Sequence, residues 1–253
     1  AGILNIGAVT SQTNALTLDS GSTALATMGL TSMVDASGGL TIRDSGGLAT
    51  IGDIGSGTAG AVTITDSTGG VTFNANVDST TFTIAKALDA AVITFTGDTV
   101  DITTAFNPNI ATGVGADDTS DAYSVTINTR AFNAAGDTNF LNKGTVTLGN
   151  EAADVLTFTG GLATTGNTSN PATVNAAGTI NTTDTRMDIG AVTLTAATTF
   201  DTGNAAAGIL NIGAVTSQTN ALTLDSGSTA LATMGLTSMV DASGGLTIRD
   251  SGG

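Results

Sequence analysis

Apolar and polar residues alternate in short stretches along most of the chain. Pieces in which a threonine stands between two apolar residues recur, and turn formers such as DSGG at 44–47 and DSTGG at 66–70 bound them. A period of two places the apolar pair on one face of a strand and the threonine on the other. We therefore predict strands of about five residues with the threonines facing outward. The predicted inward-facing residues are Leu40, Ile42, Val62, Ile64, Val71, Phe73, Phe82, Ile84, Ile93, Phe95, Val125, Ile127, Val146, Leu148, Leu156, Phe158, Val192 and Leu194.

The spacing of these strands predicts how they stack. Leu40 and Val62 are 22 positions apart, as are Val71 and Ile93. A coil of about 22 residues, each with two or three short strands, accounts for this spacing. The predicted fold class is all-β, a parallel β-solenoid (β-helix). Tandem β-sandwich domains also have short strands at such intervals and are the alternative.

A long internal repeat favours the solenoid. The segment 1–47 returns letter for letter as 207–253, at an offset of 206 positions. We divide the chain into one full repeat unit, 1–206, and the start of the next, identical repeat, 207–253. Tandem repeats are typical of stacked architectures, in which each unit buries its faces against its neighbours. At about 22 residues per coil, 206 residues make roughly nine coils, and we expect a screw along one axis to relate the two copies.

Two stretches interrupt the alternation. The first, 105–142, contains Pro108, Tyr123, Phe132 and Phe140, and its length predicts a loop excursion packed on the side of the solenoid by its own aromatic residues. The second, 160–187, is rich in threonine, asparagine and glycine, and we expect irregular coils there. In a sandwich fold the same stretches would be linkers between domains.

Composition narrows the classes of function. The hydrophobic content of 40% is sufficient for a core, and one glutamate and two lysines leave little from which to build surface helices. The formal charge of −15 repels phosphates and anionic headgroups, so the expected partners include no nucleic acid and no membrane insertion. Without cysteine or histidine there is no disulfide framework, no thiol site and no ordinary zinc site.

With these glycine-bounded strands, the chain resembles the large secreted β-helical repeat proteins of bacteria, such as filamentous-haemagglutinin-like and autotransporter-type adhesins. The segments that carry the resemblance are GLTIRDSG at 39–46, GAVTITDSTG at 60–69, GVTF at 70–73, GTVTL at 144–148 and GAVTLT at 190–195. The resemblance implies secretion, a β-helical fold and a role in adhesion or as an extracellular fibre.

Calcium is the candidate metal because aspartate is so abundant. Asp117, Asp118 and Asp121 place three carboxylates within five positions, and calcium needs several converging oxygen ligands. The repeat motif of calcium-binding β-rolls and the EF-hand pattern are both absent from the sequence. Aspartate as a turn former and solubilising charge is therefore the competing interpretation of this loop.

Two further functions have weaker signals. Outward threonine pairs could order water for ice binding, but the pairs 63/65, 81/83, 94/96, 145/147, 157/159 and 193/195 are unevenly spaced. A polysaccharide-cleaving β-helix would need acidic pairs, for which Asp98 with Asp101 and Asp184 with Asp188 are the candidates. We expect no enzyme activity and no catalytic residues.

The sequence thus predicts a structural repeat of an extracellular or cell-surface fibre, sheath or adhesin stalk. The expected partners are copies of itself joined head to tail, in the same chain or as neighbouring subunits. The alternative is a ligand-binding adhesin with calcium-stabilised loops and a surface or glycan ligand. Calcium is the one cofactor considered. No cap is visible, because the last 47 residues equal the first 47, so we expect such an end to continue.

Overall fold

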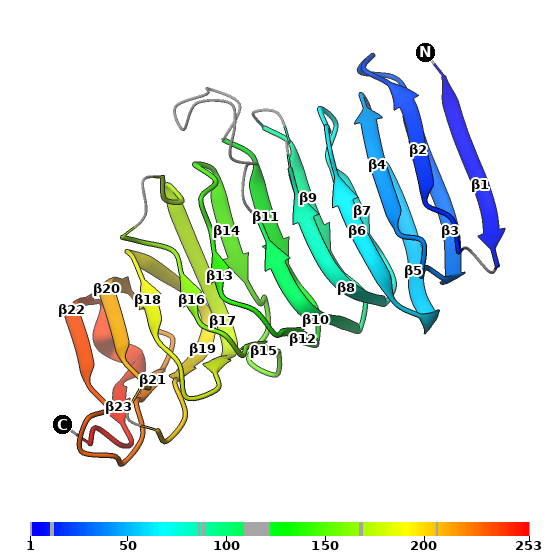
Figure 1. The fold of residues 1–253 in the computed structure, drawn as a ribbon. Coiled ribbons are helices and arrows are strands. Elements are labelled where there is room, and N and C mark those ends of the chain that lie inside the picture. The colour runs from blue at the N-terminus through cyan, green and yellow to red at the C-terminus, as the bar shows by residue number, and fades with distance from the viewer. Residues whose placement is uncertain are drawn as a thin grey trace.

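The computed structural model describes residues 2–10, 13–85, 87, 90–108, 122–166, 169–205 and 207–252. The chain forms a parallel β-solenoid of about nine turns with coils about 24 residues apart, which confirms the predicted fold class. The coils stack from β1 at the N-terminal end to β22 and β23 at the C-terminal end (Figure 1). No helix in the described part of the chain has the length and apolar character needed to cross a membrane.

The described strands range from 2 to 10 residues in length, and the described residues also include the 3-10 turn η2 (Ala242–Gly244) near the C-terminus. The strands are β1 (Ile3–Val9), β2 (Leu16–Gly21), β3 (Thr27–Asp35), β4 (Leu40–Ser45), β5 (Ala49–Thr58), β6 (Gly60–Ile64), β7 (Val71–Phe73), β8 (Val77–Ile84), β9 (Val92–Phe95), β10 (Thr99–Asn107), β11 (Ser124–Ile127), β12 (Ala131–Ala134), β13 (Thr138–Asn139), β14 (Thr145–Leu148), β15 (Val155–Phe158), β16 (Leu162–Ala163), β17 (Thr173–Thr182), β18 (Met187–Ile189), β19 (Val192–Asp201), β20 (Leu210–Thr216), β21 (Leu222–Asp225), β22 (Met234–Val240) and β23 (Leu246–Ile248).

Each coil contributes to three ladders of parallel pairing, and the chain visits them in a fixed order. Ladder 1 is the column of paired residues that begins at Leu4 and continues through Met28 and Ala49 into the later coils. Ladder 2 starts at Val9 and continues through Met33 and the later coils. The strands of ladder 1 are β1, β3, β5, β7, β9, β11, β14, β17, β19, β20 and β22. Those of ladder 2 are β1, β3, β5, β8, β10, β12, β15, β17, β19, β21 and β23.

Ladder 3 completes the coil. It starts at Leu16 of β2 and passes through β4, β6, β8 and β10. Phe106 of β10 then packs on Phe140, which follows β13, with 6.0 Å between the ring centroids. The ladder continues through β16, β18, β20 and β22.

Long strands such as β17 turn from ladder 1 to ladder 2 without a loop. The register shifts between Ala176 and Gly178, where the chain takes this corner. Gly178 has φ +80°, and a Cβ there would lie 2.4 Å from the carbonyl oxygen of Asp154. Glycine is required at this corner because a side chain would meet both backbone strain and the neighbouring coil.

The predicted register is confirmed where the alternation is clear. Leu40 pairs with Val62, and Val71 pairs with Ile93. The mean coil is longer than the predicted 22 residues because some corners carry extra residues. Ile93 pairs with Val125, 32 positions later.

All the residues predicted to face inward are buried, at no more than 3% exposure. The threonines between them, such as Thr63 and Thr147, are half-buried on the outside, where neighbouring coils cover part of each side chain. The inward residues stack on similar residues, as in the ladder 1 column through Val71, Ile93 and Val125. Burial of this continuous apolar column is the main favourable term for stacking.

Aromatic rings fill the middle of the core. Phe73 and Phe95 stack with centroids 5.3 Å apart and planes 15° apart. Phe82, Phe106 and Phe132 continue the cluster through edge-on contacts. Seven of the eight phenylalanines are linked by ring contacts in this part of the core, at the centroid distances that aromatic pairs favour.

The structure corrects the predicted excursion at 105–142. Its described residues, 105–108 and 122–142, lie in β10, β11, β12, β13 and the corners between them. Phe132 and Phe140 are fully buried in the core, because each follows the same two-residue alternation as the other inward residues. Tyr123 is also buried, and its hydroxyl donates a hydrogen bond to the carbonyl oxygen of Pro108 at 2.9 Å. Residues 109–121 lie outside the described residues.

The described residues of 160–187, where we expect irregular coils, lie in the same ladders as the rest of the chain, with a register shift in β17 between Ala176 and Gly178. The described residues there include the short strand β16 and all of β17, which pairs in parallel with β14 and β15 on one side and β19 on the other. Asparagine and alanine replace the usual threonine and large apolar residues in β17, which hides the alternation in the sequence.

The two copies of the 47-residue segment fold alike. Leu4 pairs with Met28, and Leu210, at the same place in the second copy, pairs with Met234. Likewise Leu16 pairs with Leu40, and Leu222 pairs with Leu246. Equal pairing in different surroundings indicates that the register is specified by the segment itself.

Removing the ring of Phe95 should destabilise the fold strongly. Phe95→Ala leaves a cavity among Phe73, Phe82, Phe106 and Phe132, and we expect a loss of about 3–5 kcal/mol in the free energy of unfolding. Urea denaturation followed by circular dichroism measures this loss. Thr94→Ala, on the outward face of the same strand, is the control and should cost less than about 1 kcal/mol. Equal losses for the two variants would contradict the assigned register.

Candidate functional site: the end surfaces and the outer columns

The repeated segment allows the same residues to be compared with and without a neighbouring coil. In the first copy Leu40 and Ile42 are 1% and 0% exposed, because β6 covers β4. Their equivalents in the second copy, Leu246 and Ile248 of the edge strand β23, are 42% and 55% exposed. The C-terminal end of the solenoid is thus an apolar surface that the first copy buries beneath a further coil.

The N-terminal end shows the converse relation. Leu4 and Val9 of the edge strand β1 are half-buried, whereas Leu210 and Val215 are fully buried beneath β18 and β19. Edge strands also present unpaired backbone groups, which favour pairing with another strand. Both ends of the solenoid therefore have the chemistry of an interface for a further coil.

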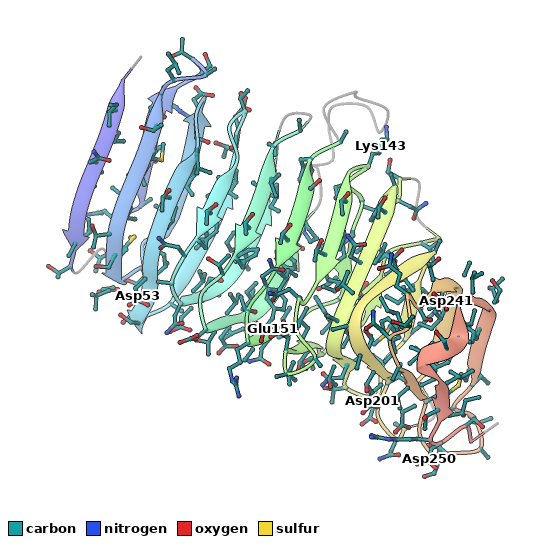
Figure 2. The ribbon with its side chains drawn as sticks, turned by 180° about the vertical axis from the view of Figure 1, so that it is seen from behind. Asp53, Lys143, Glu151, Asp201, Asp241 and Asp250 are labelled. Carbon is teal, nitrogen blue, oxygen red and sulfur yellow. The ribbon has the colours of Figure 1, made fainter. Side chains whose placement is uncertain are left out.

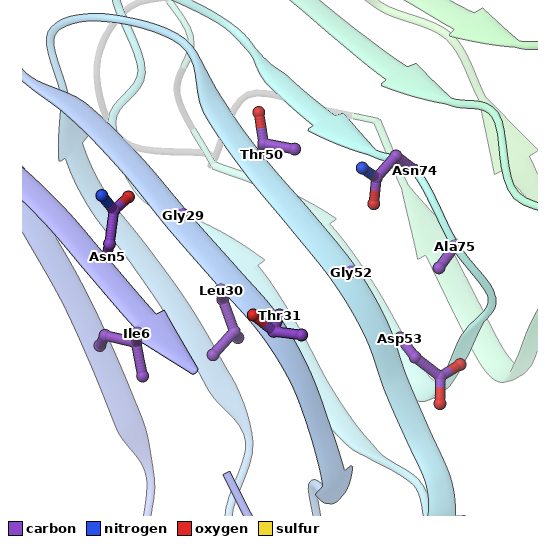
Figure 3. A pocket seen from close by; sticks show the side chains of 10 residues that line it. All are labelled: Asn5, Ile6, Gly29, Leu30, Thr31, Thr50, Gly52, Asp53, Asn74 and Ala75. Atoms are coloured by element: carbon purple, nitrogen blue, oxygen red, sulfur yellow. The ribbon is translucent and has the colours of Figure 1, made fainter. Parts of the chain in front are cut away.

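A shallow groove crosses β1, β3 and β5 on the outside of ladder 1 (Figure 3). It exists because Gly29 lacks a side chain between the outward residues Asn5 and Thr50. A Cβ on Gly29 would lie 3.0 Å from Oδ1 of Asn5, and one on Gly235 would lie 3.3 Å from Oδ1 of Asn211. The same asparagine therefore lies over the same glycine in both copies.

Outward threonines form a column that sequence spacing did not reveal. On ladder 1, Thr50, Thr72, Thr94, Thr126 and Thr147 occupy the same outward position on five successive coils. The threonine pairs considered for ice binding do not share a face: Thr63 belongs to ladder 3, Thr94 to ladder 1 and Thr157 to ladder 2. The column depends on pairing across coils of unequal length, which the sequence alone does not show.

Aspartates form two pairs in the outward column of ladder 2, which we call the aspartate column, with Asn133, Thr157 and Asn181 between the pairs. Asp78 pairs with Asp101 on one part of the ladder, and Asp201 pairs with Asp225 on another. Partial burial raises the pKa of Asp78, and the nearby charges of Asp101 and Asp53 raise it further. The labelled acidic residues Asp53, Glu151 and Asp201 lie on the outside of the coils at separate points along the axis (Figure 2).

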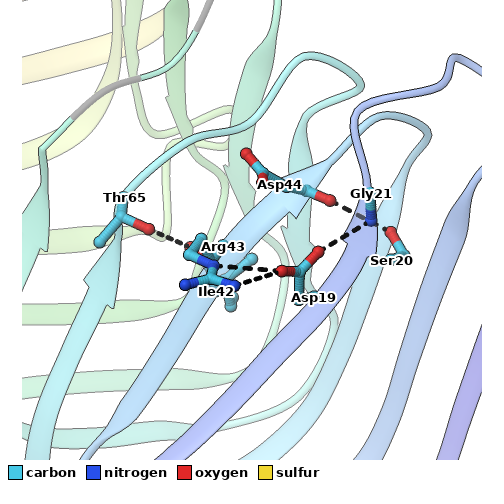
Figure 4. Close-up of polar contacts among 7 residues, drawn as sticks. All are labelled: Asp19, Ser20, Gly21, Ile42, Arg43, Asp44 and Thr65. Carbon is cyan, nitrogen blue, oxygen red and sulfur yellow. Dashed lines mark hydrogen bonds and ion pairs between the residues drawn. The ribbon is translucent and has the colours of Figure 1, made fainter.

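Arg43 and Asp19 form an ion pair between adjacent coils of ladder 3. Nη2 of Arg43 lies 2.7 Å from Oδ2 of Asp19, and the backbone N–H of Gly21 donates to Oδ1 of Asp19 at 2.9 Å (Figure 4). The hydrogen bond from Arg43, followed by that from Gly21, holds the pKa of Asp19 below its usual value. The pair is exposed, so it contributes little to stability.

Aspartates at corners serve as turn formers. The side chains of Asp19, Asp201 and Asp225 each accept a hydrogen bond from the backbone N–H two residues later. Asp184 accepts hydrogen bonds from the backbone N–H groups of Asn204 and Ala205, at 2.7 and 2.8 Å. These bonds explain part of the abundance of aspartate through local backbone geometry.

The predicted calcium ligands cannot be placed. Asp117, Asp118 and Asp121 all lie outside the described residues. Within the described ranges, no group of three or more aspartate, glutamate, histidine or cysteine side chains is arranged to hold a metal ion. The calcium site stays a prediction about 109–121.

The carboxylates considered for catalysis either hold local structure or are exposed on the outside of the coils. Asp184 holds a corner, and Asp188 accepts hydrogen bonds from Arg186 and, at 2.8 Å, from Asn211. Asp98 and Asp101 are exposed on the outside, where Asp101 faces Asp78 of the preceding coil.

No protein-family model, curated protein or solved structure matches this chain.

Mutation can compare one residue in the interior of the solenoid with its identical equivalent at the end surface. Ile42→Ala removes a side chain buried between two coils and should cost about 2–5 kcal/mol of unfolding free energy. Ile248→Ala makes the same change at the half-exposed equivalent and should cost less than about 1 kcal/mol. Urea denaturation of both variants measures the two losses. Similar losses would mean that the second copy is covered in solution as fully as the first.

The raised pKa of Asp78 predicts a dependence of stability on pH. The carboxylate is disfavoured in the folded chain, so its contribution is present below the usual aspartate pKa and is lost as pH rises through the raised pKa. Asp78→Asn should therefore stabilise the fold at pH 7 by about 0.5 kcal/mol, and by little at pH 3. Thermal unfolding at both pH values measures the effect. Asp98→Asn, which removes an exposed charge, is the control, and an equal gain there would indicate a net-charge effect.

Proposed function

We propose that this chain is a structural repeat of an extracellular fibre, sheath or adhesin stalk that extends head to tail. The observation that carries the proposal is the burial of the second copy of the 47-residue segment against the coil before it. Leu210 and Leu222 of that copy are buried, and they pair with β18 and β19 of the first repeat in the same stack of coils. A unit that stacks on its own repeat in this way extends a fibre without a separate joining domain.

The composition of the outside supports the same role. The formal charge of −15 keeps parallel fibres apart and soluble, while burial of the apolar ends favours the stacking of coils. The outer columns of threonine and aspartate face solvent, so their hydrogen-bonding groups need no bound ligand as a partner. Secretion and the cell-surface location follow from the resemblance to bacterial β-helical adhesins and are part of the proposal.

End-to-end assembly of the chain tests this function. At increasing protein concentration we expect filaments in electron micrographs and a rise in the sedimentation coefficient. Because like charges oppose association, added salt should favour assembly. Leu246→Asp combined with Ile248→Asp places charges on the apolar end and should abolish the filaments.

Val155→Asp is the matched control, because Val155 is 42% exposed on β15, which is paired on both sides in the middle of the solenoid and away from both end surfaces. This variant should assemble like the unmodified chain. A chain that stays monomeric at every concentration and salt level would argue against the proposed function.

A further inference from the structure

The two identical copies occupy different ladders of the same solenoid. Leu4 belongs to ladder 1, where the next residues of its column are Met28 and Ala49. Its equivalent Leu210 belongs to ladder 3, where it pairs with Met187 of β18. The same strand therefore begins on one face in the first repeat and on another face in the second.

The rest of the copy follows the same displacement. Val9 lies in ladder 2, but Val215 pairs with Val192 in ladder 1. Leu16 lies in ladder 3, but Leu222 pairs with Thr198 in ladder 2. The displacement is one ladder throughout, so it is a property of the repeat length and not of one irregular strand.

We infer that successive repeats in the fibre are each turned by about a third of a turn about the solenoid axis. From Leu4 to Leu210 the chain completes eight coils and two of the three ladders of a ninth, or about 8⅔ coils. With coils about 4.8 Å apart, the rise per repeat is about 42 Å, and a feature returns to the same face after three repeats, or about 125 Å. This inference rests on the proposed head-to-tail extension.

The partner of the N-terminal end surface is then a defined segment of a second repeat. Inside the chain, 187–201 covers the second copy: Met187 lies on Leu210, and Phe200 lies on Leu224. Nδ2 of Asn211 donates a hydrogen bond to Oδ1 of Asp188 at 2.8 Å across this junction. Where a preceding repeat continues into this one through a peptide bond, we assign its segment 187–201 as the occupant of β1 and β2, with Asn5 as the polar partner of Asp188.

The rotation determines what each side of the fibre presents. The threonine column, the aspartate column and the groove between Asn5 and Thr50 each lie on one side of a repeat. In the next repeat each lies a third of a turn away. A partner that binds one of these features therefore finds it on a different side of the fibre in each of three successive repeats. No side of the fibre is uniformly acidic or uniformly hydroxylated.

Engineered disulfides in the 253-residue chain test the rotation, since the chain contains no cysteine. Asp188→Cys with Asn211→Cys joins ladder 3 partners, and Thr199→Cys with Thr223→Cys joins ladder 2 partners. Both pairs should crosslink under mild oxidation, because residues opposite each other on adjacent coils lie within the Cα distance that a disulfide spans.

Two exchanged pairs are the matched controls. Without the rotation, position 211 would lie in ladder 1 beside Thr193, and position 223 would lie in ladder 3 beside Asp188. Thr193→Cys with Asn211→Cys and Asp188→Cys with Thr223→Cys should therefore crosslink at least about tenfold more slowly than the true pairs. Free-thiol titration and mobility on non-reducing gels measure the rates. Faster crosslinking of the exchanged pairs would overturn the inference.

These measurements separate the inference from the proposed function, because every crosslink forms within one chain. Crosslinks in the true pairs without filaments would keep the rotation and refute the fibre. Filaments with crosslinks only in the exchanged pairs would keep the fibre and refute the rotation.

Discussion

Parallel pairing of each coil with the coils above and below is the constraint on which the rest of this structure depends. Backbone N–H and C=O groups must be paired where they are buried, and in a parallel ladder they are paired only by a neighbouring coil. This condition fixes the axial spacing and aligns equivalent residues in columns. The inward columns become the core through Val71, Ile93 and Val125, and the outward columns become rows of threonine or aspartate.

The same constraint explains which parts of the fold could be predicted from sequence. Where an apolar residue stands on each side of a threonine, as at Leu40 to Ile42, the alternation predicted both the strand and its inward residues. The coil length was underestimated because corners tolerate insertions that leave the ladders unchanged, as between Ile93 and Val125. The excursion was predicted around Phe132 and Phe140 because β12 and β13 are short and lie in a stretch with few repeated threonines.

The candidate surfaces were less accessible to sequence reasoning. The threonine column through Thr94 and Thr126 requires pairing residues 32 positions apart, and no regular spacing signals that pairing. Recognising the rotation between repeats requires counting ladders across every corner. The identical sequence of the two segments does not show that they lie on different faces. From the sequence we expected an end made of interior sequence to continue, because the last 47 residues equal the first 47. Ile248 is 55% exposed at that end, whereas its equivalent Ile42 is buried beneath a further coil.

We infer that one repeat continues into the next as a single solenoid with a rotation of about a third of a turn. Helical reconstruction of assembled filaments by cryo-electron microscopy measures both the continuity and the rotation. We expect an uninterrupted axial spacing of about 4.8 Å across the junction, and repeats related by a rise of about 42 Å and a rotation of about 120°. Separate globular units joined by linkers, or repeats related by a rise with no rotation, would contradict it.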